Sequence, residues 1–326
     1  MQEQNTDRAP VGMIGLGLMG TVLARRLIDA GRAVVGFDIE PDKGAGLVAM
    51  GGHAAASVRE VAAQCNPIVL AVFSTDQVEA VTEEILTALG EGSGKVVLCT
   101  STCDPDRIAA LGTKVGPRGL RFLETPVSGT SEQVRVGDGV GLIGGEAATA
   151  AAVDEVLAIL FPRRFHVGKV GDGGRAKLAV NLILGLNRLA LAEGLVFAER
   201  LGLDPAAFFD VARQSAAYSQ VMETKGPKML RGDFAPEGRV RQTLKDVHLM
   251  QEQAQRLGQV LPLLAVHCDV LEACVRNGEA DLDNSAVIRE IRRRRCEEPQ
   301  RGDEAIQSAE QASGLLRCAR NDEKGP

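Results

Sequence analysis

Three glycines near the N-terminus constrain the fold of this chain more than any other feature. They follow the apolar run 11–14 directly and precede a segment with apolar residues at helical spacing. In a strand–turn–helix unit the first glycine permits a tight turn, the second lets the backbone approach a pyrophosphate, and the third lets helix and strand pack closely. The free N–H groups of the helix N-terminus favour the same anion. The pattern therefore predicts a dinucleotide site whose residues here are Gly15, Leu16, Gly17, Leu18, Met19 and Gly20.

A carboxylate ends the next apolar run. Asp38 lies about 20 residues beyond the glycine turn, where an acidic side chain accepts hydrogen bonds from the adenosine ribose. It would repel a 2′-phosphate and its neighbour Ile39 supplies no cation, so the sequence favours NAD over NADP. Lys43 is close enough in sequence to leave NADP open as a second choice. The alternative for Asp38 is a turn or helix-capping role before Pro41.

The chain divides into an α/β half and a helical half. Up to about residue 170, helical patterns alternate with apolar runs bounded by Gly, Asp or Pro, as expected of parallel strands buried on both faces. These runs lie at 11–15, 33–38, 67–73, 95–100, 121–127 and 139–145. After Gly168 only helical patterns follow, at 175–201, 205–215, 240–257, 262–276 and 284–293.

We therefore predict an α/β fold, an N-terminal Rossmann domain followed by an all-α domain. The Rossmann domain spans 10–170 and contains a doubly wound parallel sheet. The all-α domain spans 171–293 and starts with a long linking helix at about 175–201. The last stretch, 294–326, has mixed charge and no sustained period, so we expect a disordered or loosely attached tail.

Composition and charge exclude several classes of protein. The chain is 45% apolar and 25% charged, as in ordinary globular proteins, and its net charge of −6 with no Trp and one Tyr argues against nucleic-acid binding. The seven cysteines form no CxxC pair and have no histidine at zinc-ligand spacing, which indicates reduced thiols and no metal site. The first residues do not read as a secretory signal, and no uninterrupted apolar run is long enough to span a membrane. We expect a cytoplasmic protein without a membrane partner.

A second motif combines glycines with a polar pair. Gly171, Gly173 and Gly174 precede Lys177 and Asn181, which are four residues apart and so share one helix face. A lysine beside an amide can hold a hydroxyl group and move its proton. A solvated helix face is the alternative for a single lysine, but the apolar stretch after Asn181 indicates that this pair is buried.

These motifs, taken together, resemble the β-hydroxyacid dehydrogenase family, typified by 3-hydroxyisobutyrate dehydrogenase and tartronate semialdehyde reductase. The resemblance rests on the glycine turn at 15–20, Glu-Thr-Pro-Val-Ser-Gly-Thr at 124–130, the motif at 171–181 and Lys245-Asp246. The motifs occur in the same order over about residues 11–293. The resemblance implies an active site between the two domains, a small carboxylate substrate and a homodimer or homotetramer.

The resemblance also implies a role for each matching residue. Lys177 would be the general acid/base, and Asn181 would hold the reacting oxygen or the substrate. Thr102 would lie at the nicotinamide end of the cofactor, and Lys245 would reach cofactor or substrate with Asp246 orienting its surroundings. The residues implied to bind the substrate carboxylate are Ser128, Gly129 and Thr130.

The sequence thus predicts an NAD-dependent oxidoreductase that interconverts a small β-hydroxy acid and its semialdehyde or keto acid, similar to 3-hydroxyisobutyrate dehydrogenase. One alternative is an NADPH-dependent reductase of the tartronate-semialdehyde type. The other is a non-catalytic dinucleotide-binding protein on the same fold, since a fold does not prove a function.

Overall fold

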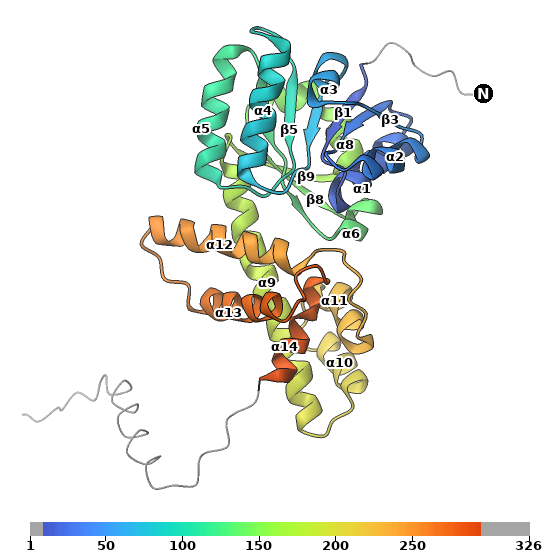
Figure 1. Cartoon of the computed structure of the whole chain (residues 1–326). Coiled ribbons are helices and arrows are strands. Elements are labelled where there is room, and N and C mark those ends of the chain that lie inside the picture. Colours follow the sequence, from blue (N-terminus) through green and yellow to red (C-terminus); the bar gives the residue numbers. More distant parts are fainter. Residues whose placement is uncertain (1–8, 295–326) are drawn as a thin grey trace, which may run out of the picture. The chain divides into compact units, whose positions relative to one another are not determined.

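The computed structural model describes residues 9–294 (Figure 1). Contacts connect its elements as far as Ile291. The strands are β1 (Val11–Ile14), β2 (Val34–Phe37), β3 (His53–Ala54), β4 (Ile68–Leu70), β5 (Val96–Cys99), β6 (Arg121–Glu124), β7 (Val127–Ser128), β8 (Val140–Gly144) and β9 (Arg163–Gly168). The helices before residue 170 are α1 (Leu18–Asp29), α2 (Pro41–Ala49), α3 (Val58–Gln64), α4 (Thr75–Leu89), α5 (Pro105–Val115), α6 (Ser131–Arg135), α7 (Ala147–Ala152) and α8 (Asp154–Leu160). The later helices are α9 (Asp172–Arg200), α10 (Pro205–Gln214), α11 (Gln220–Arg231), α12 (Val240–Arg256), α13 (Pro262–Arg276) and α14 (Val287–Arg293). The predicted tail lies outside the described residues, apart from Arg294 at its start.

The strands form one sheet in the order β3-β2-β1-β4-β5-β6-β8-β7, with β9 beside β8. The first six strands in this order, β3-β2-β1-β4-β5-β6, are parallel to one another, which confirms the doubly wound Rossmann fold. The expectation that every strand is parallel is wrong for β8, which runs antiparallel to β6 and β7. The connection from β7 to β8 contains only the short α6, whereas a parallel crossover needs a dozen or more residues. Sequence analysis also missed β9, because this strand is largely exposed and carries no apolar run.

Two apolar cores lie on the two faces of the sheet. Val11 and Met13 pack with side chains of α1, α2, α6 and α8, whereas Ile14 and Val35 pack with those of α3, α4 and α5. Successive strand residues therefore point to opposite cores, as the pleat requires. Burial on both faces explains why the strands are continuous apolar runs. Figure 1 shows α4 and α5 side by side against the sheet.

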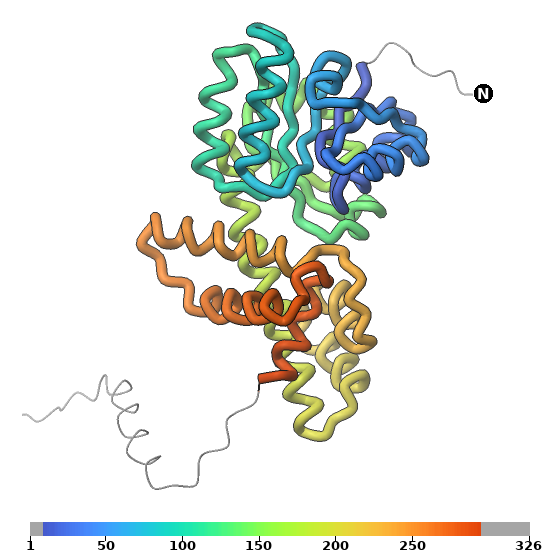
Figure 2. Tube along the Cα trace, in the orientation of Figure 1, coloured from blue at the N-terminus to red at the C-terminus, as the bar shows by residue number. Residues whose placement is uncertain are grey.

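A third core surrounds α9, which contacts α10, α11, α12 and α13 (Figure 2). The sequence did not predict α11, because its segment is polar and contains Pro227 inside the helix. By length and composition α9 could cross a membrane, and it is the one helix among residues 9–294 that could. The core helix of a soluble protein passes the same test, and α9 carries the buried cations Lys177 and Arg188. The length and composition of α9 are therefore only weak evidence for a membrane-spanning helix.

A buried carboxylate determines where α9 begins. The Glu124 side chain is 3% exposed and accepts hydrogen bonds from the backbone N–H groups of Gly171 and Gly174, the latter at 3.2 Å. A Cβ at Gly173 would lie 2.9 Å from the Leu142 carbonyl oxygen, so only glycine lets the helix approach the sheet this closely. The glycines therefore mark a packing contact as well as a helix start. This start is at Asp172, one turn before the predicted position.

Burial raises the pKa of Glu124 from 4.5 to about 7, against the lowering effect of its hydrogen bonds to backbone N–H groups. In the unfolded chain the carboxyl group ionises near its ordinary pKa, while in the folded protein it holds its proton until about pH 7. A folded-state pKa raised in this way makes the folded state less stable as the pH rises from about 4.5 to about 7. The loss is about 3 kcal/mol for a shift of this size.

We expect Glu124→Gln to remove this pH dependence, because the amide cannot ionise. The variant loses one hydrogen-bond acceptor, so its stability at pH 5 should lie below that of the native protein. Between pH 5 and pH 7.5 the difference should shift in favour of the variant. Urea denaturation at the two pH values measures this, and a constant difference would contradict the assignment.

Candidate active site

The glycine turn is shaped to receive a pyrophosphate. Gly15 has φ +90°, and a Cβ there would lie 2.6 Å from the Ala71 carbonyl oxygen. A Cβ at Gly20 would lie 1.9 Å from the Gly15 oxygen, so α1 must pack against the turn without a side chain. A Cβ at Gly17 would meet nothing within 4 Å, and no side chain caps α1. Open space beside a helix N-terminus fits a dinucleotide phosphate.

Asp38 fills the turn role considered for it, and its ribose role stays a prediction. Its Oδ2 accepts a hydrogen bond from the Leu16 N–H at 2.6 Å, and its Oδ1 accepts one from the Glu40 N–H at 3.0 Å. The carboxylate therefore holds the glycine turn and the end of β2 together. It stays half-buried at the predicted ribose position. Ile39 beside it is 82% exposed and brings no positive charge.

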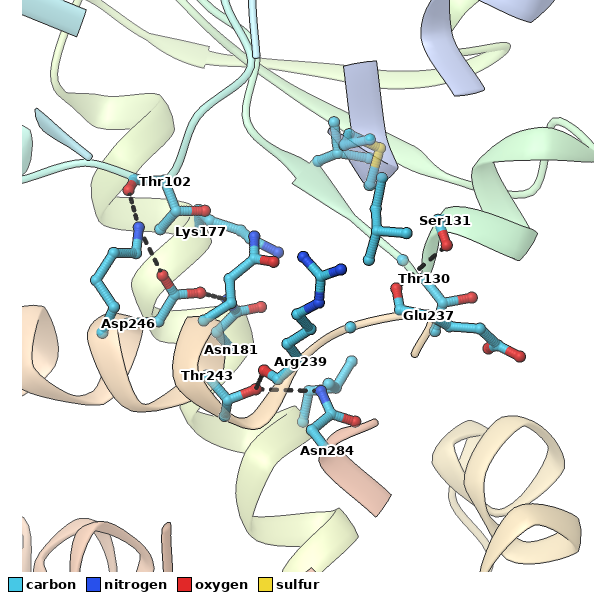
Figure 3. A pocket seen from close by; sticks show the side chains of 18 of the residues that line it. Thr102, Thr130, Ser131, Lys177, Asn181, Glu237, Arg239, Thr243, Asp246 and Asn284 are labelled. Carbon is cyan, nitrogen blue, oxygen red and sulfur yellow. Dashed lines mark hydrogen bonds and ion pairs between the residues drawn. The ribbon is translucent and has the colours of Figure 1, made fainter. Parts of the chain in front are cut away.

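A cavity of about 180 Å³ lies where the Rossmann part meets α9 and α12 (Figure 3). The predicted site residues that line it are Leu18, Met19, Thr102, Gly129, Thr130, Lys177, Asn181 and Lys245. Gly15, Leu16, Gly17, Gly20 and Asp38 belong to the nucleotide turn and do not line the cavity, and neither does Ser128. Figure 3 shows Lys177, Asn181 and Asp246 on one side of the cavity and Thr130, Ser131 and Glu237 on the other.

Of the polar pair on α9, Lys177 is buried, as predicted, and Asn181 is half-buried. Lys177 is 7% exposed, and Asn181 donates a hydrogen bond from Nδ2 to Asp246 Oδ2 at 2.9 Å. Burial lowers the pKa of Lys177 from 10.5 to about 8; the negative charge of Asp246 opposes this shift and the positive charge of Lys245 adds to it. At neutral pH the lysine can therefore exchange a proton at low cost, which suits a general acid/base.

Lys245 joins α12 to the Rossmann part. Its ammonium group donates a hydrogen bond to the Thr102 carbonyl oxygen and forms an ion pair with Asp246 Oδ1 at 3.1 Å. It also lies 5.6 Å from the centre of the Phe73 ring. These contacts hold α12, Asn181 and the loop after β5 in one arrangement around the cavity.

The segment 128–130 fits its predicted role only in part. Thr130 caps α6: its hydroxyl oxygen accepts a hydrogen bond from the Gln133 N–H at 3.2 Å, and its own N–H donates to Gln133 Oε1 at 2.9 Å. Its N–H is therefore engaged, while its hydroxyl proton can still reach a carboxylate. Gly129 has φ +140°, a conformation that favours glycine. Ser131, which follows Thr130, donates to the Glu237 carbonyl oxygen and ties α6 to the helical part.

Sequence reasoning missed several polar residues of the cavity. They include Arg188, Lys225, Arg239, His267 and Asn284. Arg188 could have been found, because it follows Lys177 by eleven residues and Asn181 by seven, which is the spacing of one helix face. The others come from four separate segments that only the tertiary structure brings together.

One cluster outside the cavity bears on metal binding. His248, Cys268 and Glu272 place one potential ligand atom each within 4.8 Å of one another, between α12 and α13. The spacing in sequence does not reveal this group. The expectation of no metal site stays a prediction.

The fold and the cavity define a dinucleotide-binding oxidoreductase with a buried lysine. Comparison with known protein families and relatives supports this class. Residues 10–168 match the family described as the NAD-binding domain of 6-phosphogluconate dehydrogenase, and residues 171–291 match the NAD-binding family of NADP-dependent 3-hydroxyisobutyrate dehydrogenase. The chain is 31% identical to L-threonate dehydrogenase of Cupriavidus necator, over 86% of this chain and 95% of that protein. It is 30% identical to 2-hydroxy-3-oxopropionate reductase of Escherichia coli, over 86% of this chain and 96% of that protein.

Solved structures show the same architecture. The 3-hydroxyisobutyrate dehydrogenase of Mycobacterium tuberculosis, solved with L-serine, superposes with a TM-score of 0.78 at 26% identity, over 87% of this chain and 99% of that one. The chain belongs to the β-hydroxyacid dehydrogenase family of NAD(P)-dependent oxidoreductases. The resemblance found in the motifs is therefore confirmed.

We expect Asp38→Ala to weaken NAD binding more than NADP binding, because a ribose acceptor and a group that repels the 2′-phosphate disappear together. The substitution also frees the Leu16 N–H, so some loss should affect both cofactors. Asp38→Asn is the matched control that keeps an acceptor for the turn and removes the charge. Fluorescence titration with each reduced cofactor measures the ratio of dissociation constants, and an unchanged ratio in both variants would contradict the NAD assignment.

Proposed function

We propose that this protein is an NAD-dependent dehydrogenase that interconverts a small β-hydroxy acid and its semialdehyde or keto acid. The observation that carries the proposal is Lys177, a buried lysine with a pKa lowered to about 8, in a cavity bordered by the start of α1 and the loop after β5. The relatives named above are dehydrogenases and reductases of acids that carry hydroxyl or oxo groups. Their reaction class supports the proposal.

The bound nicotinamide would accept or supply the hydride, and the protein would supply position and proton transfer. In oxidation, the neutral amine of Lys177 takes the proton of the substrate hydroxyl. In reduction, the ammonium form of Lys177 gives a proton to the carbonyl oxygen. Asn181, held by Asp246, would orient the reacting oxygen through its side-chain amide. Gly129 and the Thr130 hydroxyl would hold the substrate carboxylate on the other side of the cavity.

The two alternatives fit the site less well. A non-catalytic dinucleotide-binding protein has no use for a lysine that is buried beside the cofactor at a cost in free energy. An NADPH-dependent reductase of the same family would need a cation near the ribose, and Asp38 stands there instead. The cofactor titration of Asp38 variants separates this alternative from the proposal.

Self-association of this chain is a further part of the proposal. Helix α9 carries the apolar side chains Ile183 and Phe197, which are 62% and 64% exposed in the single chain. Apolar residues exposed on a helix of this length favour a contact with another copy, because burying them stabilises the assembly. The expected assembly is a homodimer or homotetramer.

Replacing Lys177 tests the mechanism. Lys177→Ala should lower turnover on the order of 10²–10⁴-fold, the usual contribution of a positioned acid/base. NAD affinity should change little, because the glycine turn and Asp38 hold the cofactor. Lys177→Arg should not restore turnover, since a guanidinium keeps its proton at any working pH. Steady-state kinetics with a good substrate measures this, and native turnover in Lys177→Ala would refute the role.

The pH dependence tests the charges around Lys177. Below about pH 8, kcat/KM for oxidation should rise about tenfold per pH unit, because only the neutral amine acts as a base. Asp246→Asn should move this rise to lower pH, since the Asp246 charge raises the pKa of Lys177. Lys245→Met should move it to higher pH, since the Lys245 charge lowers that pKa. Shifts in the same direction would contradict the assignment of Lys177.

A further inference from the structure

We propose that Arg188 binds a second carboxylate of the substrate, so that this enzyme acts on hydroxy acids with two acidic groups. The inference rests on the proposed function and adds the substrate class. It concerns the part of the cavity formed by the middle of α9 and by the segments around Lys225, His267 and Asn284, which no part of the mechanism above uses.

Arg188 is a buried cation without a partner. Its side chain is 1% exposed, and it forms no hydrogen bond or ion pair with residues 9–294. Burial lowers the pKa of its guanidinium from 12.5 to about 10, so the group stays charged at neutral pH. A buried charge without hydrogen bonds destabilises the folded protein, because it loses its contacts with water and gains none in return. The protein therefore keeps an unpaired, destabilising charge on the wall of its substrate cavity.

The two unsatisfied nitrogen atoms of Arg188 are the pair that can donate two parallel hydrogen bonds to one carboxylate. Nε and Nη2 lie on one edge of the guanidinium, and both lack an acceptor. Elsewhere in this chain the same two atoms bind carboxylates in parallel: Arg107 on Glu79, and Arg213 on Glu223. Planar, two-point recognition is the chemistry for which arginine is suited. Arg188 lines the cavity, so rotation of its terminal bonds can present this edge to a bound substrate.

The neighbouring acid cannot serve as the partner of Arg188. Asp283 attracts the Arg188 charge, but its carboxylate accepts hydrogen bonds from Lys225 Nζ at 2.9 Å to each oxygen. It also accepts from the Ser285 hydroxyl and from backbone N–H groups of Glu237, Gly238 and Ser285. Its acceptor positions are occupied, so an anion from outside the chain is needed to balance Arg188.

Other unsatisfied polar atoms surround the same end of the cavity. His267 Nε2 and Asn284 Oδ1 are buried without a hydrogen-bond partner. Burial and the Arg188 charge lower the pKa of His267 to about 3, so its ring is neutral and adds no charge. A Cβ at Gly185 would lie 2.6 Å from His267 Cε1, so this glycine lets the ring pack against α9 beside Arg188. A cluster of buried polar groups without partners in the described chain fits a polar ligand.

The position of Arg188 limits the length of the substrate. Along α9 it lies eleven residues after Lys177, about 16 Å at 1.5 Å per residue. Helical side chains lean toward the N-terminus, so the long arginine side chain points back toward Lys177 and shortens this gap. The second carboxylate should therefore sit at the end of an arm of a few carbons beyond the reacting alcohol. A substrate as small as 3-hydroxyisobutyrate would not reach Arg188.

Three compounds form a matched series for the test. 2-(Hydroxymethyl)glutarate carries the arm with a carboxylate, its 5-amide carries the same arm without charge, and 3-hydroxyisobutyrate lacks the arm. The native enzyme should have a kcat/KM for the diacid roughly 10- to 100-fold above that for the amide, the value of a charged two-point hydrogen bond. In Arg188→Met this ratio should fall to about one, and in Arg188→Lys it should fall part of the way. Lys228→Met is the control, because Lys228 is a buried cation outside the cavity, and it should keep the native ratio.

A binding measurement separates this inference from the proposed function. In the presence of NAD, glutarate should raise the melting temperature of the native protein more than butyrate does, and Arg188→Met should abolish the difference. This readout needs no turnover, so it reports on Arg188 even if no hydroxy acid is oxidised, an outcome that would contradict only the proposed function. Without ligand, Arg188→Met should melt at or above the native temperature, since it removes an unpaired charge. A much lower melting temperature, or equal losses for the diacid and the amide, would overturn the inference.

Discussion

The active site depends on one contact, the packing of the α9 N-terminus against the end of β6. The carboxyl group of Glu124 accepts hydrogen bonds from the first backbone N–H groups of α9, and Gly173 permits the close approach. The position of Lys177 follows from this contact, because it lies in the second turn of the same helix. This arrangement buries the Glu124 carboxyl group, and burial raises the pKa of that group.

Helix α12 completes the environment of the lysine. Asp246 holds Asn181 and attracts the ammonium form of Lys177, while Lys245 repels it and binds the loop after β5. Opposite charges on adjacent residues therefore act on one buried amine. Burial lowers the pKa of this amine most, and together with the two charges it leaves a group that can both take and give a proton near neutral pH.

Helix α9 carries both the proposed proton-transfer residues and the proposed anion site. Lys177 and Asn181 lie near its N-terminus beside the nucleotide turn, and Arg188 lies two to three turns further along the same face. A rigid helix fixes the spacing between the reacting group and a distal anion site.

The sequence by itself determined the Rossmann fold, the glycine turn with Asp38 and the polar pair of Lys177 and Asn181, because these depend on local spacing and on apolar runs. The antiparallel β8 could not be read in this way, since strand direction depends on the length of a connection rather than on apolar pattern. The tertiary structure alone decided that the Thr130 N–H is engaged in a cap and that Ser128 lies off the cavity wall. It also brought Arg188, His267 and Asn284 together from three segments. A polar residue shows its role only when its partners are known, and partners distant in sequence meet only in the folded chain.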